Sequence, residues 1–264
     1  MPTVAQIEQA LFQLAPKDLA FDWDNVGHLE GSPDQEVQRV LVALDVTENV
    51  VSEAEKLGCQ LIVSHHPLMN VRWHQAEMQT LRPDRYLGRL LRRLVKTDIS
   101  VISMHTNLDI APGGVNDALA EALRIEDPGP MPGDETGLCR VGRLRNPVKL
   151  SDFAGEVCKA LHANGVRYAG DRPVEYIAVG GACGDEIDAV IAAGCDTFVT
   201  SDLTYHQFLD TTPKGINLID AGHFPTEDPV CAKIVAYLEK EFPQLTIIKS
   251  ASLKEVIQYF VEGE

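Results

Sequence analysis

Two stretches of the chain decide its fold: RVLVALDVTENVVSEAEKLGCQLIVSHH at residues 39–66 and EYIAVGGACGDEIDAVIAAGCDTFVTSD at residues 175–202. They align without a gap, and each reads as an apolar strand, a turn, an amphipathic helix and a second apolar strand. Gly58 and Gly194 stand where the helices end, in the position that favours a left-handed cap. Because a short strand–helix–strand connection makes a right-handed parallel crossover, the repeat predicts two related α/β units.

A second pair of segments matches in the same way, ISVISMHTNLD at residues 99–109 and INLIDAGHFPTE at residues 216–227. Each contains an apolar strand followed by a histidine, and an acidic residue lies four positions after that histidine. In open α/β sheets, ligands bind beyond the carboxyl ends of the strands. Each half is therefore expected to present one polar cluster at such an edge.

The predicted fold class is α/β, with two intertwined domains built from the repeat and with mixed sheets. The segment DPGPMPGD at residues 127–134 is rich in proline and glycine and marks a boundary. Because the second polar cluster lies near the C-terminus, the N-terminal domain is expected to recruit C-terminal residues. The predicted domains are residues 1–126 plus 214–264, which carry most of the candidate ligands, and residues 127–213.

Periodicity and capping signals predict further elements. Thr3 and Gln6 have capping-box spacing at the start of an amphipathic helix that ends before Pro16. Ser151 is expected to cap another helix. The other expected elements are a strand near 138–144, a turn at Asn146 and Pro147, a helix over 229–240 and a strand over 245–248. The segment EVIQYFVEG at 255–263 fits a strand or a helix.

The composition excludes several functional classes. The chain has 264 residues, of which 45% are hydrophobic, and no apolar run approaches the roughly 18 residues that cross a bilayer. Its start lacks the basic region and apolar block of a secretory signal, and its six cysteines contain no CxxC pair, so a cytoplasmic location is expected. A formal net charge of −16 argues against binding to nucleic acid or to anionic membranes.

One basic stretch departs from this acidic balance. It contains seven cations, Arg72, Arg82, Arg85, Arg89, Arg92, Arg93 and Lys96. They alternate with an apolar stripe of Leu87, Leu90, Leu91, Leu94 and Val95, which predicts an amphipathic helix with a solvated basic face. Binding of an anionic substrate and pairing with a neighbouring acidic subunit are the alternatives.

The motif SHHP at residues 64–67 is the first candidate metal site. His65 and His66 follow an apolar strand, and Pro67 ends regular pairing there. Adjacent side chains point to opposite sides of an extended chain, so each imidazole would serve a different ion of a close pair. The alternative is two hydrogen-bonded histidines at a strand edge. Since the cysteines lack zinc-finger spacing, a metal bound here should have nitrogen and oxygen ligands.

Two acids complete the candidate ligand set. Asp109 and Glu227 follow His105 and His223 by four residues, and a carboxylate can bridge two ions. Asp109 as a turn residue and Glu227 as a helix-capping acid are the alternatives. His105 fits a ligand, a residue that orients a ligand, or a packed histidine, and the second interpretation is favoured. Because Pro225 disfavours a helix, an irregular loop is expected to bring His223 and Glu227 together.

Other polar residues near the strand ends have weaker signals. His206, in TSDLTYHQ at residues 200–207, is interpreted as a proton donor or acceptor, with a surface histidine on a short helix as the alternative. Asp220 ends a strand and is expected to orient a ligand. Asp24 and Asn25 either reach the site or only form the turn in which they lie.

Taken in order, the motifs DNVG, SHHP, HTNLD with APGGVND, YHQ and DAGHxxTE resemble the dinuclear-metal-centre hexameric family known as GTP cyclohydrolase 1 type 2-like, over nearly the whole chain. The resemblance implies intertwined α/β domains, a toroidal homohexamer and two divalent ions that face an internal cavity. Mixed histidine and carboxylate ligands suit Zn, Fe, Mn, Co or Ni. The resemblance implies a role as metal ligands, with at least one bridging carboxylate, for His65, His66, Asp109, His223 and Glu227. It also implies that His105 and His206 line the pocket.

The sequence departs from the family pattern in two places. His28 and Glu30 interrupt the apolar run expected after DNVG, and Ser201 and Asp202 stand where glycine and an acid are usual. Both departures are expected to affect only the lining of the pocket.

These expectations favour a metal-dependent hydrolase acting on a small polar, nucleotide-like substrate. Five nitrogen and oxygen ligands leave coordination positions open, and a metal pair lowers the pKa of a water between the ions. His206 or His105 would deliver the proton to the leaving group, and arginines of the basic stretch would receive an anionic part of the substrate. The alternative is a metal-binding or metal-delivery protein, or an assembly scaffold, without turnover.

Overall fold

The structure is a computed structural model that describes residues 1–69 and 80–260, and these residues form two compact units. The first unit comprises Met1–Pro112 and Cys231–Lys254. The second comprises Gly113–Val230 and the described residues from Glu255 onward. Each unit takes in a segment from a distant part of the chain, so the domains are intertwined as expected.

The unit boundaries lie elsewhere than the predicted division placed them. Residues 113–126, 214–230 and 255–260, assigned by the sequence to the first domain, belong to the second unit. The reason is local: helix α5 (Val115–Ala122) packs against the second unit's sheet, and strand β10 (Asn217–Asp220) is part of that sheet.

The first unit contains a five-stranded mixed sheet in the order β1-β4-β3-β2-β11. Strands β2, β3, β4 and β11 are parallel, and β1 is an antiparallel strand at one edge. The strands are β1 (Gly27–Glu30), β2 (Arg39–Ala43), β3 (Leu61–Ser64), β4 (Ser100–Ser103) and β11 (Thr246–Lys249). Strand β11 comes from the C-terminal part of the chain and pairs with β2, which extends the sheet beyond the sequence repeat.

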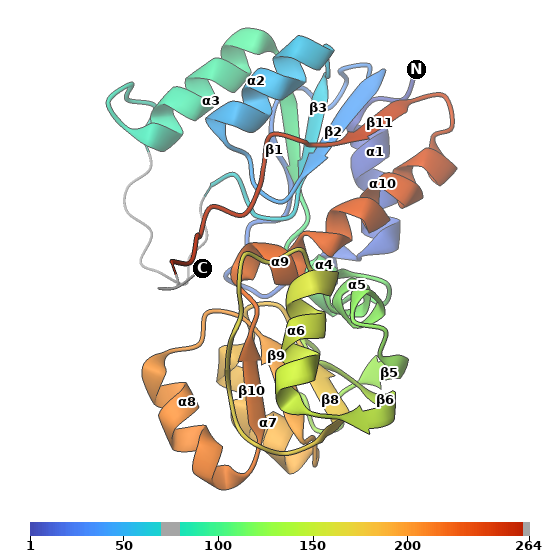
Figure 1. Cartoon of the computed structure of the whole chain (residues 1–264). Helices are drawn as coiled ribbons and strands as arrows, with labels where there is room; N and C mark the ends of the chain where they lie inside the picture. The colour runs from blue at the N-terminus through green and yellow to red at the C-terminus, as the bar shows by residue number, and fades with distance from the viewer. Residues whose placement is uncertain (70–79, 261–264) are drawn as a thin grey trace. The chain divides into compact units, whose positions relative to one another are not determined.

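Helices cover both faces of this sheet (Figure 1). Helices α2 (Glu48–Leu57) and α3 (Tyr86–Thr97) lie on one face, and α1 (Val4–Leu14) and α10 (Pro229–Glu241) lie on the other. The predicted capping box of Thr3 and Gln6 is present at the start of α1. Gly58 ends α2 at a φ of 64°, as expected for a left-handed cap. The unit also contains the 3-10 helix η1 (Lys17–Leu19) and helix α4 (Thr106–Ile110).

The second unit contains a six-stranded mixed sheet in the order β5-β6-β8-β9-β10-β7. Strands β8, β9 and β10 are parallel, and the other three are antiparallel to their neighbours. Besides β10, the strands are β5 (Glu126–Pro130), β6 (Arg140–Val148), β7 (Arg167–Ala169), β8 (Val174–Val179) and β9 (Thr197–Thr200).

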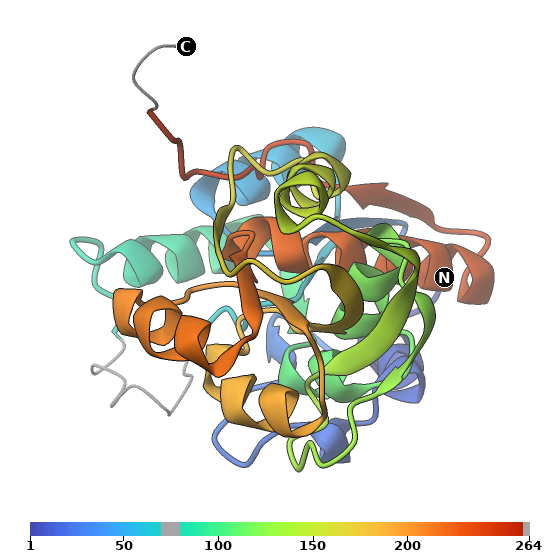
Figure 2. The same ribbon diagram turned by 60° about the horizontal axis from the view of Figure 1, so that its bottom comes forward.

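Apolar clusters attach helices to both faces of this second sheet (Figure 2). Helices α5 and α6 (Leu150–Ala160) pack on one face, and α7 (Ile187–Ala192) and α8 (Tyr205–Thr211) pack on the other. Gly194 follows α7 in the predicted left-handed conformation, at a φ of 79°. The short elements are α9 (His223–Glu227), η3 (Gly184–Glu186) and η4 (Thr212–Lys214).

Two local predictions near α6 are wrong. The helix begins at Leu150, and its N-cap is Lys149, so Ser151 lies inside the first turn and caps nothing. Asn146 and Pro147 lie within strand β6, where the register shifts between Arg143 and Val148, and they form no separate turn. The irregular stretch admits proline because that position makes no regular ladder bond.

Helix α3 is amphipathic as predicted, with one exception in its apolar stripe. Leu90, Leu91 and Leu94 are buried, whereas Val95 is 64% exposed. The predicted apolar stripe therefore wrongly included Val95. Arg72, the first residue of the basic stretch, lies outside the described residues.

Two arginines of α3 make ion pairs with helix α2. Arg93 lies 2.6 Å from Glu55, and Arg89 lies 3.3 Å from Glu48. Exposed pairs of this kind stabilise a fold only slightly. They show that part of the basic face is matched within its own unit, as expected for a solvated helix surface.

The segment 255–260 forms neither the strand nor the helix that the sequence allowed, and residues 261–263 of the same segment lie outside the described residues. Asn164 Nδ2 donates a hydrogen bond to the carbonyl of Ile257 at 2.7 Å, which fastens this segment to the second unit. Across the described part of the chain, no helix combines the length and the apolar character needed to span a bilayer.

Candidate metal centre

Three histidines gather at the carboxyl ends of β3 and β4 in the first unit. His65 and His66 follow β3, and His105 follows β4, which pairs in parallel with β3 up to Ser64 and Ser103. The ring centroids lie 4.9 Å apart for His65 and His66, and 5.3 and 5.8 Å from His105. One nitrogen from each ring lies within 4.8 Å of the others, so the three rings form a group that could hold a metal ion.

Hydrogen bonds fix the orientation of each ring in this group. In all three histidines, Nδ1 faces an oxygen that can only accept a hydrogen bond. The acceptors are the Met104 carbonyl for His65 (2.8 Å), Asp45 Oδ1 for His66 (2.7 Å) and Asp24 Oδ1 for His105 (2.9 Å). The proton therefore sits on Nδ1, and in the neutral ring Nε2 carries the lone pair. This is the arrangement in which proteins present histidines to metals.

Asp109 lies beside the same group. Its Oδ1 is 3.5 Å from Nε2 of His65, and its side chain is 15% exposed. The predicted four-residue spacing is realised by α4, because His105 caps the helix and Asp109 lies one turn further on. The structure thus brings His65, His66 and Asp109 together with His105 in the first unit.

Asp24 is a buried support for His105. Its carboxylate accepts hydrogen bonds from His105 Nδ1, from the Thr106 N–H at 3.0 Å and from the Thr106 hydroxyl at 2.5 Å. Burial raises the pKa of Asp24, but the hydrogen bond and charge of His105 and the bonds from Thr106 lower it further, to about 2. Asp24 therefore contacts the site through His105. Of the two interpretations that the sequence left open for Asp24, a residue that reaches the site or one that only forms a turn, the structure supports the first.

His223 and Glu227 form a second cluster in the other unit. His223 Nε2 lies 2.9 Å from Glu227 Oε2, and His223 Nδ1 lies 2.5 Å from Asp202 Oδ2. Both residues belong to the short helix α9, so the expected irregular loop is wrong. Pro225 is compatible with this helix because it lies in the first turn, where a backbone N–H has no helical partner.

The two carboxylates shift the protonation of His223. Burial lowers its pKa, but hydrogen bonds and charges from Asp202 and Glu227 outweigh burial and raise the pKa to about 11. An imidazolium between two carboxylates fills the place that a divalent cation would take. A metal ligated through Nε2 would therefore have to displace this proton.

Glu227 is almost fully buried, at 4% exposure, and its position depends on a glycine. A Cβ atom on Gly181 would lie 2.8 Å from Glu227 Cγ and 3.0 Å from its Oε1. The N–H of Gly181 donates to Asn116 Oδ1 at 2.8 Å, which holds the loop after β8 in place. Sequence reasoning missed both residues, although a Gly-Gly pair after an apolar strand was a signal.

Comparison with known proteins assigns the family. The family model Duf34/NIF3 (NGG1p interacting factor 3) matches residues 2–255. The chain belongs to this family. A GTP cyclohydrolase 1 type 2 homolog of Streptomyces coelicolor is 38% identical over 252 residues, covering 91% of this chain and 87% of the relative. One from Clostridium perfringens is 36% identical over 229 residues, with 84% and 85% covered.

Solved structures of Duf34/NIF3 relatives and similar proteins have the same fold. A Bacillus cereus protein related to NIF3 superposes with a TM-score of 0.90 at 23% identity, covering 98% of this chain and 99% of that one. The Staphylococcus aureus protein SA1388 gives 0.88 at 28% identity with the same coverage. Reduced HcgD from Methanocaldococcus jannaschii gives 0.79 at 30% identity, with 94% and 97% covered.

Two further candidates in this Duf34/NIF3 chain are Asp220 and His206. Asp220 is buried, and its carboxylate accepts hydrogen bonds from the Leu203 N–H at 2.9 Å and the Gly222 N–H at 3.0 Å. It also forms an ion pair with Arg167. It therefore braces the loops on either side of the Asp202–His223 pair. His206 is exposed on α8, with its ring 5.4 Å from Tyr205.

The departures at His28 and Glu30 lie in strand β1, outside the histidine group. The N–H of His28 donates to Glu8 Oε1 at 2.7 Å. Burial and the charge of Asp98 raise the pKa of Glu30 to about 7. The expectation that these two residues alter the lining of the pocket stays a prediction. The Trp23 ring packs edge-on against His105, with 6.1 Å between the ring centroids, and no sequence motif predicted this contact.

Proposed function

We propose that this protein is a metal-dependent hydrolase that holds two divalent ions with His65, His66, Asp109, His223 and Glu227. One observation carries the proposal: the histidines of both clusters donate Nδ1–H to a fixed oxygen, and Nε2 of both His65 and His223 faces a carboxylate. Imidazole and carboxylate ligands suit Zn, Fe, Mn, Co or Ni.

The proposed reaction is hydrolysis of a small, nucleotide-like substrate. The name of the relatives, GTP cyclohydrolase 1 type 2 homolog, supports this substrate class, and the net charge of −16 speaks against a nucleic-acid polymer. Two divalent ions, when bound, supply polarisation of a water molecule and of the substrate's carbonyl, imine or phosphoryl group.

We assign proton transfer to His105. Its Nδ1 is held by Asp24, so Nε2 is the nitrogen that would accept or release a proton beside His65 and His66. His206 is the second candidate for this role. Its exposure on α8 leaves it accessible to a substrate, and its contribution is separable from that of His105 by mutation.

The test combines elemental analysis with a substrate screen. Gently purified protein should contain about two divalent ions per chain, and nucleotides and phosphoesters should be screened with and without chelator. Glu227→Gln should lower metal content and turnover together, whereas His105→Gln or His206→Gln should lower turnover and spare metal content. Asp210→Asn, which removes an exposed carboxylate from α8, is the matched control and should change neither.

Turnover that survives chelation and the Glu227→Gln change would refute the metal-dependent hydrolase. Full metal content without turnover of any substrate would refute catalysis and favour the metal-delivery or scaffold alternative.

We also propose a toroidal homohexamer in the cytoplasm. The hexamer is supported by the resemblance to the dinuclear family, and the cytoplasmic location is supported by six cysteines that form no disulfide within the described residues. Light scattering during size-exclusion chromatography should give the mass of six chains of 28.9 kDa. A monomer at working concentration would refute the assembly and leave the metal ligands untouched.

A further inference from the structure

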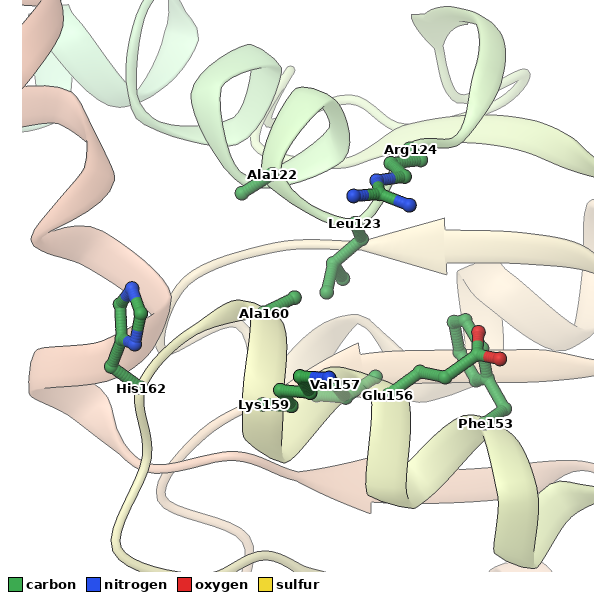
Figure 3. A pocket seen from close by; sticks show the side chains of 9 residues that line it. All are labelled: Ala122, Leu123, Arg124, Phe153, Glu156, Val157, Lys159, Ala160 and His162. Carbon is green, nitrogen blue, oxygen red and sulfur yellow. The ribbon is translucent and has the colours of Figure 1, made fainter.

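A cavity of about 450 Å³ lies within the second unit, between the end of α5 and helix α6 (Figure 3). None of its lining residues belongs to the histidine and carboxylate clusters described above. Its volume falls in the range of pockets that bind small molecules. The cavity is therefore a candidate binding site separate from the metal ligands.

The floor of this cavity is apolar. Leu123, Phe153 and Val157 line it, and they are 6%, 1% and 0% exposed because they also belong to the core between the helices and the sheet. Phe153 and Val157 are almost fully covered, so a ring or a short chain would contact Leu123 together with the more exposed lining residues Ala122 and Ala160. Burial of such a group would be favourable without rearrangement of the protein.

The rim of the cavity is basic. Arg124 follows the end of α5, while Lys159 and His162 lie at the end of α6. Figure 3 shows the Arg124 side chain on one side of the cavity and the α6 residues on the other. Glu156 is the acid among the lining residues, so Arg124 and Lys159 leave a net positive charge at this rim in a chain whose net charge is −16.

Two of these rim residues adopt a conformation that favours glycine. Arg124 has a φ of 56° and His162 a φ of 53°, each in the left-handed position just after a helix. Gly58 and Gly194 take this position after α2 and α7, and Asp98 takes it after α3. A side chain kept in such a conformation points to a role that glycine could not fill. Basic residues also suit helix C-termini, but that preference extends over the whole last turn and does not require the left-handed position.

The rim cations are not neutralised by the protein. Within the described residues, no ion pair or side-chain hydrogen bond joins Arg124, Lys159 or His162 to a carboxylate, in contrast to Arg89 and Arg93 of α3. The charges of Arg124 and Lys159 are therefore available to a ligand. An arginine and a lysine together supply the donors that a carboxylate or phosphate group accepts.

We propose that this cavity binds a small organic anion, with its apolar ring or chain on Leu123, Ala122 and Ala160. Its carboxylate or phosphate accepts hydrogen bonds from Arg124 and Lys159, and His162 closes the rim. The site does not depend on bound metal and is independent of the proposed hydrolase activity.

Isothermal titration calorimetry on the full chain tests the site with four probes. Phenyl phosphate and benzoate carry both a ring and an anion, whereas inorganic phosphate and benzyl alcohol each carry one of the two. Chelator is present throughout, so that binding at the metal ligands is removed. Phenyl phosphate or benzoate should bind saturably with one site per chain, and at least roughly tenfold more tightly than either single-feature probe.

Variants locate the binding. Arg124→Gly keeps the left-handed conformation but removes the guanidinium, and it should weaken binding of the anionic ring probe roughly tenfold, as Lys159→Gln should. Ala160→Phe, which fills the cavity and keeps its charges, should abolish binding. Arg145→Gln removes an exposed cation from β6 outside the cavity and should leave affinity within about twofold.

The proposal is overturned if neither ring-bearing anion binds saturably, or if inorganic phosphate binds as tightly as phenyl phosphate. It is equally overturned if Arg145→Gln weakens binding as much as Arg124→Gly does. Loss of hydrolase activity in any of these variants has no bearing on this outcome, because the measurement is binding to metal-free protein.

Discussion

Asp202 Oδ2 accepts a hydrogen bond from His223 Nδ1 at 2.5 Å. Asp202 adopts a left-handed conformation, with a φ of 60°, two residues after the end of strand β9. That conformation is uncommon for a residue other than glycine, and it aims the carboxylate at the ring. Asp202 thus does for His223 what Asp24 does for His105, since each aspartate holds Nδ1 and leaves Nε2 directed at the candidate metal position.

Asp202→Asn should weaken metal binding at His223 and Glu227. An asparagine keeps the shape but loses the charge that holds the Nδ1–H tautomer, so zinc affinity should fall roughly 10- to 100-fold. Competition with a chromophoric chelator measures this affinity. Asp210→Asn, a charge removal on the exposed face of α8, serves as control, and equal affinities in both variants would contradict the role of Asp202.

Asp24→Asn should destabilise the first unit in a pH-dependent way. The folded-state pKa of Asp24 is about 2, below its ordinary value of 3.8, so its ionised form stabilises the fold above pH 3.8 and this contribution is lost as the pH falls toward 2. The cost of the substitution should be about 1–3 kcal/mol at pH 7, because a buried carboxylate loses charge-assisted hydrogen bonds.

Urea denaturation at pH 7 and pH 3 measures this difference. The gap between wild type and Asp24→Asn should narrow at pH 3, while Asp22→Asn, in the same turn but exposed, should show little effect at either pH. A gap of constant size would mean that the charge of Asp24 contributes nothing to the fold.

Much of this fold could be predicted from the gapless repeat, because strand–helix–strand units with glycine caps have a limited set of arrangements. The place of β11 could not be predicted in the same way. Its apolar pattern at residues 245–248 identifies a strand, but its partner β2 lies some two hundred positions earlier, and nothing in a strand's own pattern names the strand it pairs with.

The candidate site, like the fold, could be predicted only in part. The sequence was enough to predict the five candidate ligands, because they follow strand ends at regular spacing: His65, His66, Asp109, His223 and Glu227. The oxygens that accept hydrogen bonds from the histidine Nδ1 atoms could not be predicted, because tertiary packing decides which oxygen each ring contacts. The Met104 carbonyl, for example, has no sequence signal. The prediction of an irregular loop around Pro225 was wrong because proline breaks the interior of a helix but is tolerated in its first turn.

Gly181→Ala should displace Glu227. An added Cβ would sit 2.8 Å from Glu227 Cγ, closer than atoms normally approach, and the buried carboxylate has little room to retreat. We expect a loss of about 1–3 kcal/mol in stability, together with reduced metal content, as overpacking usually costs. Chemical denaturation and elemental analysis provide the two readouts.

Gly155→Ala is the matched control for this substitution. Gly155 lies in helix α6 with nothing within 4 Å of an added Cβ, so alanine should stabilise the protein by about 0.5–1 kcal/mol. If Gly181→Ala behaves like Gly155→Ala, close packing of Glu227 on that loop is not required.

Glu30→Gln should stabilise the protein at alkaline pH and leave it unchanged in acid. Glu30 Oε2 is buried, and within the described residues it has no hydrogen-bond partner; burial and the charge of Asp98 raise its pKa from 4.5 to about 7. The folded state therefore holds a proton between pH 4.5 and 7 that the unfolded chain has lost, so the wild type loses stability as the pH rises through this window. Above pH 7 the loss is complete.

Glutamine carries no charge and therefore avoids this loss. The expected gain in stability from Glu30→Gln is about 1–2 kcal/mol at pH 8, after allowance for partial exposure, and none at pH 4.5. Urea midpoints at the two pH values check this, with the exposed Asp34→Asn as control, and a gain of the same size at pH 4.5 would show that ionisation of Glu30 is not its cause.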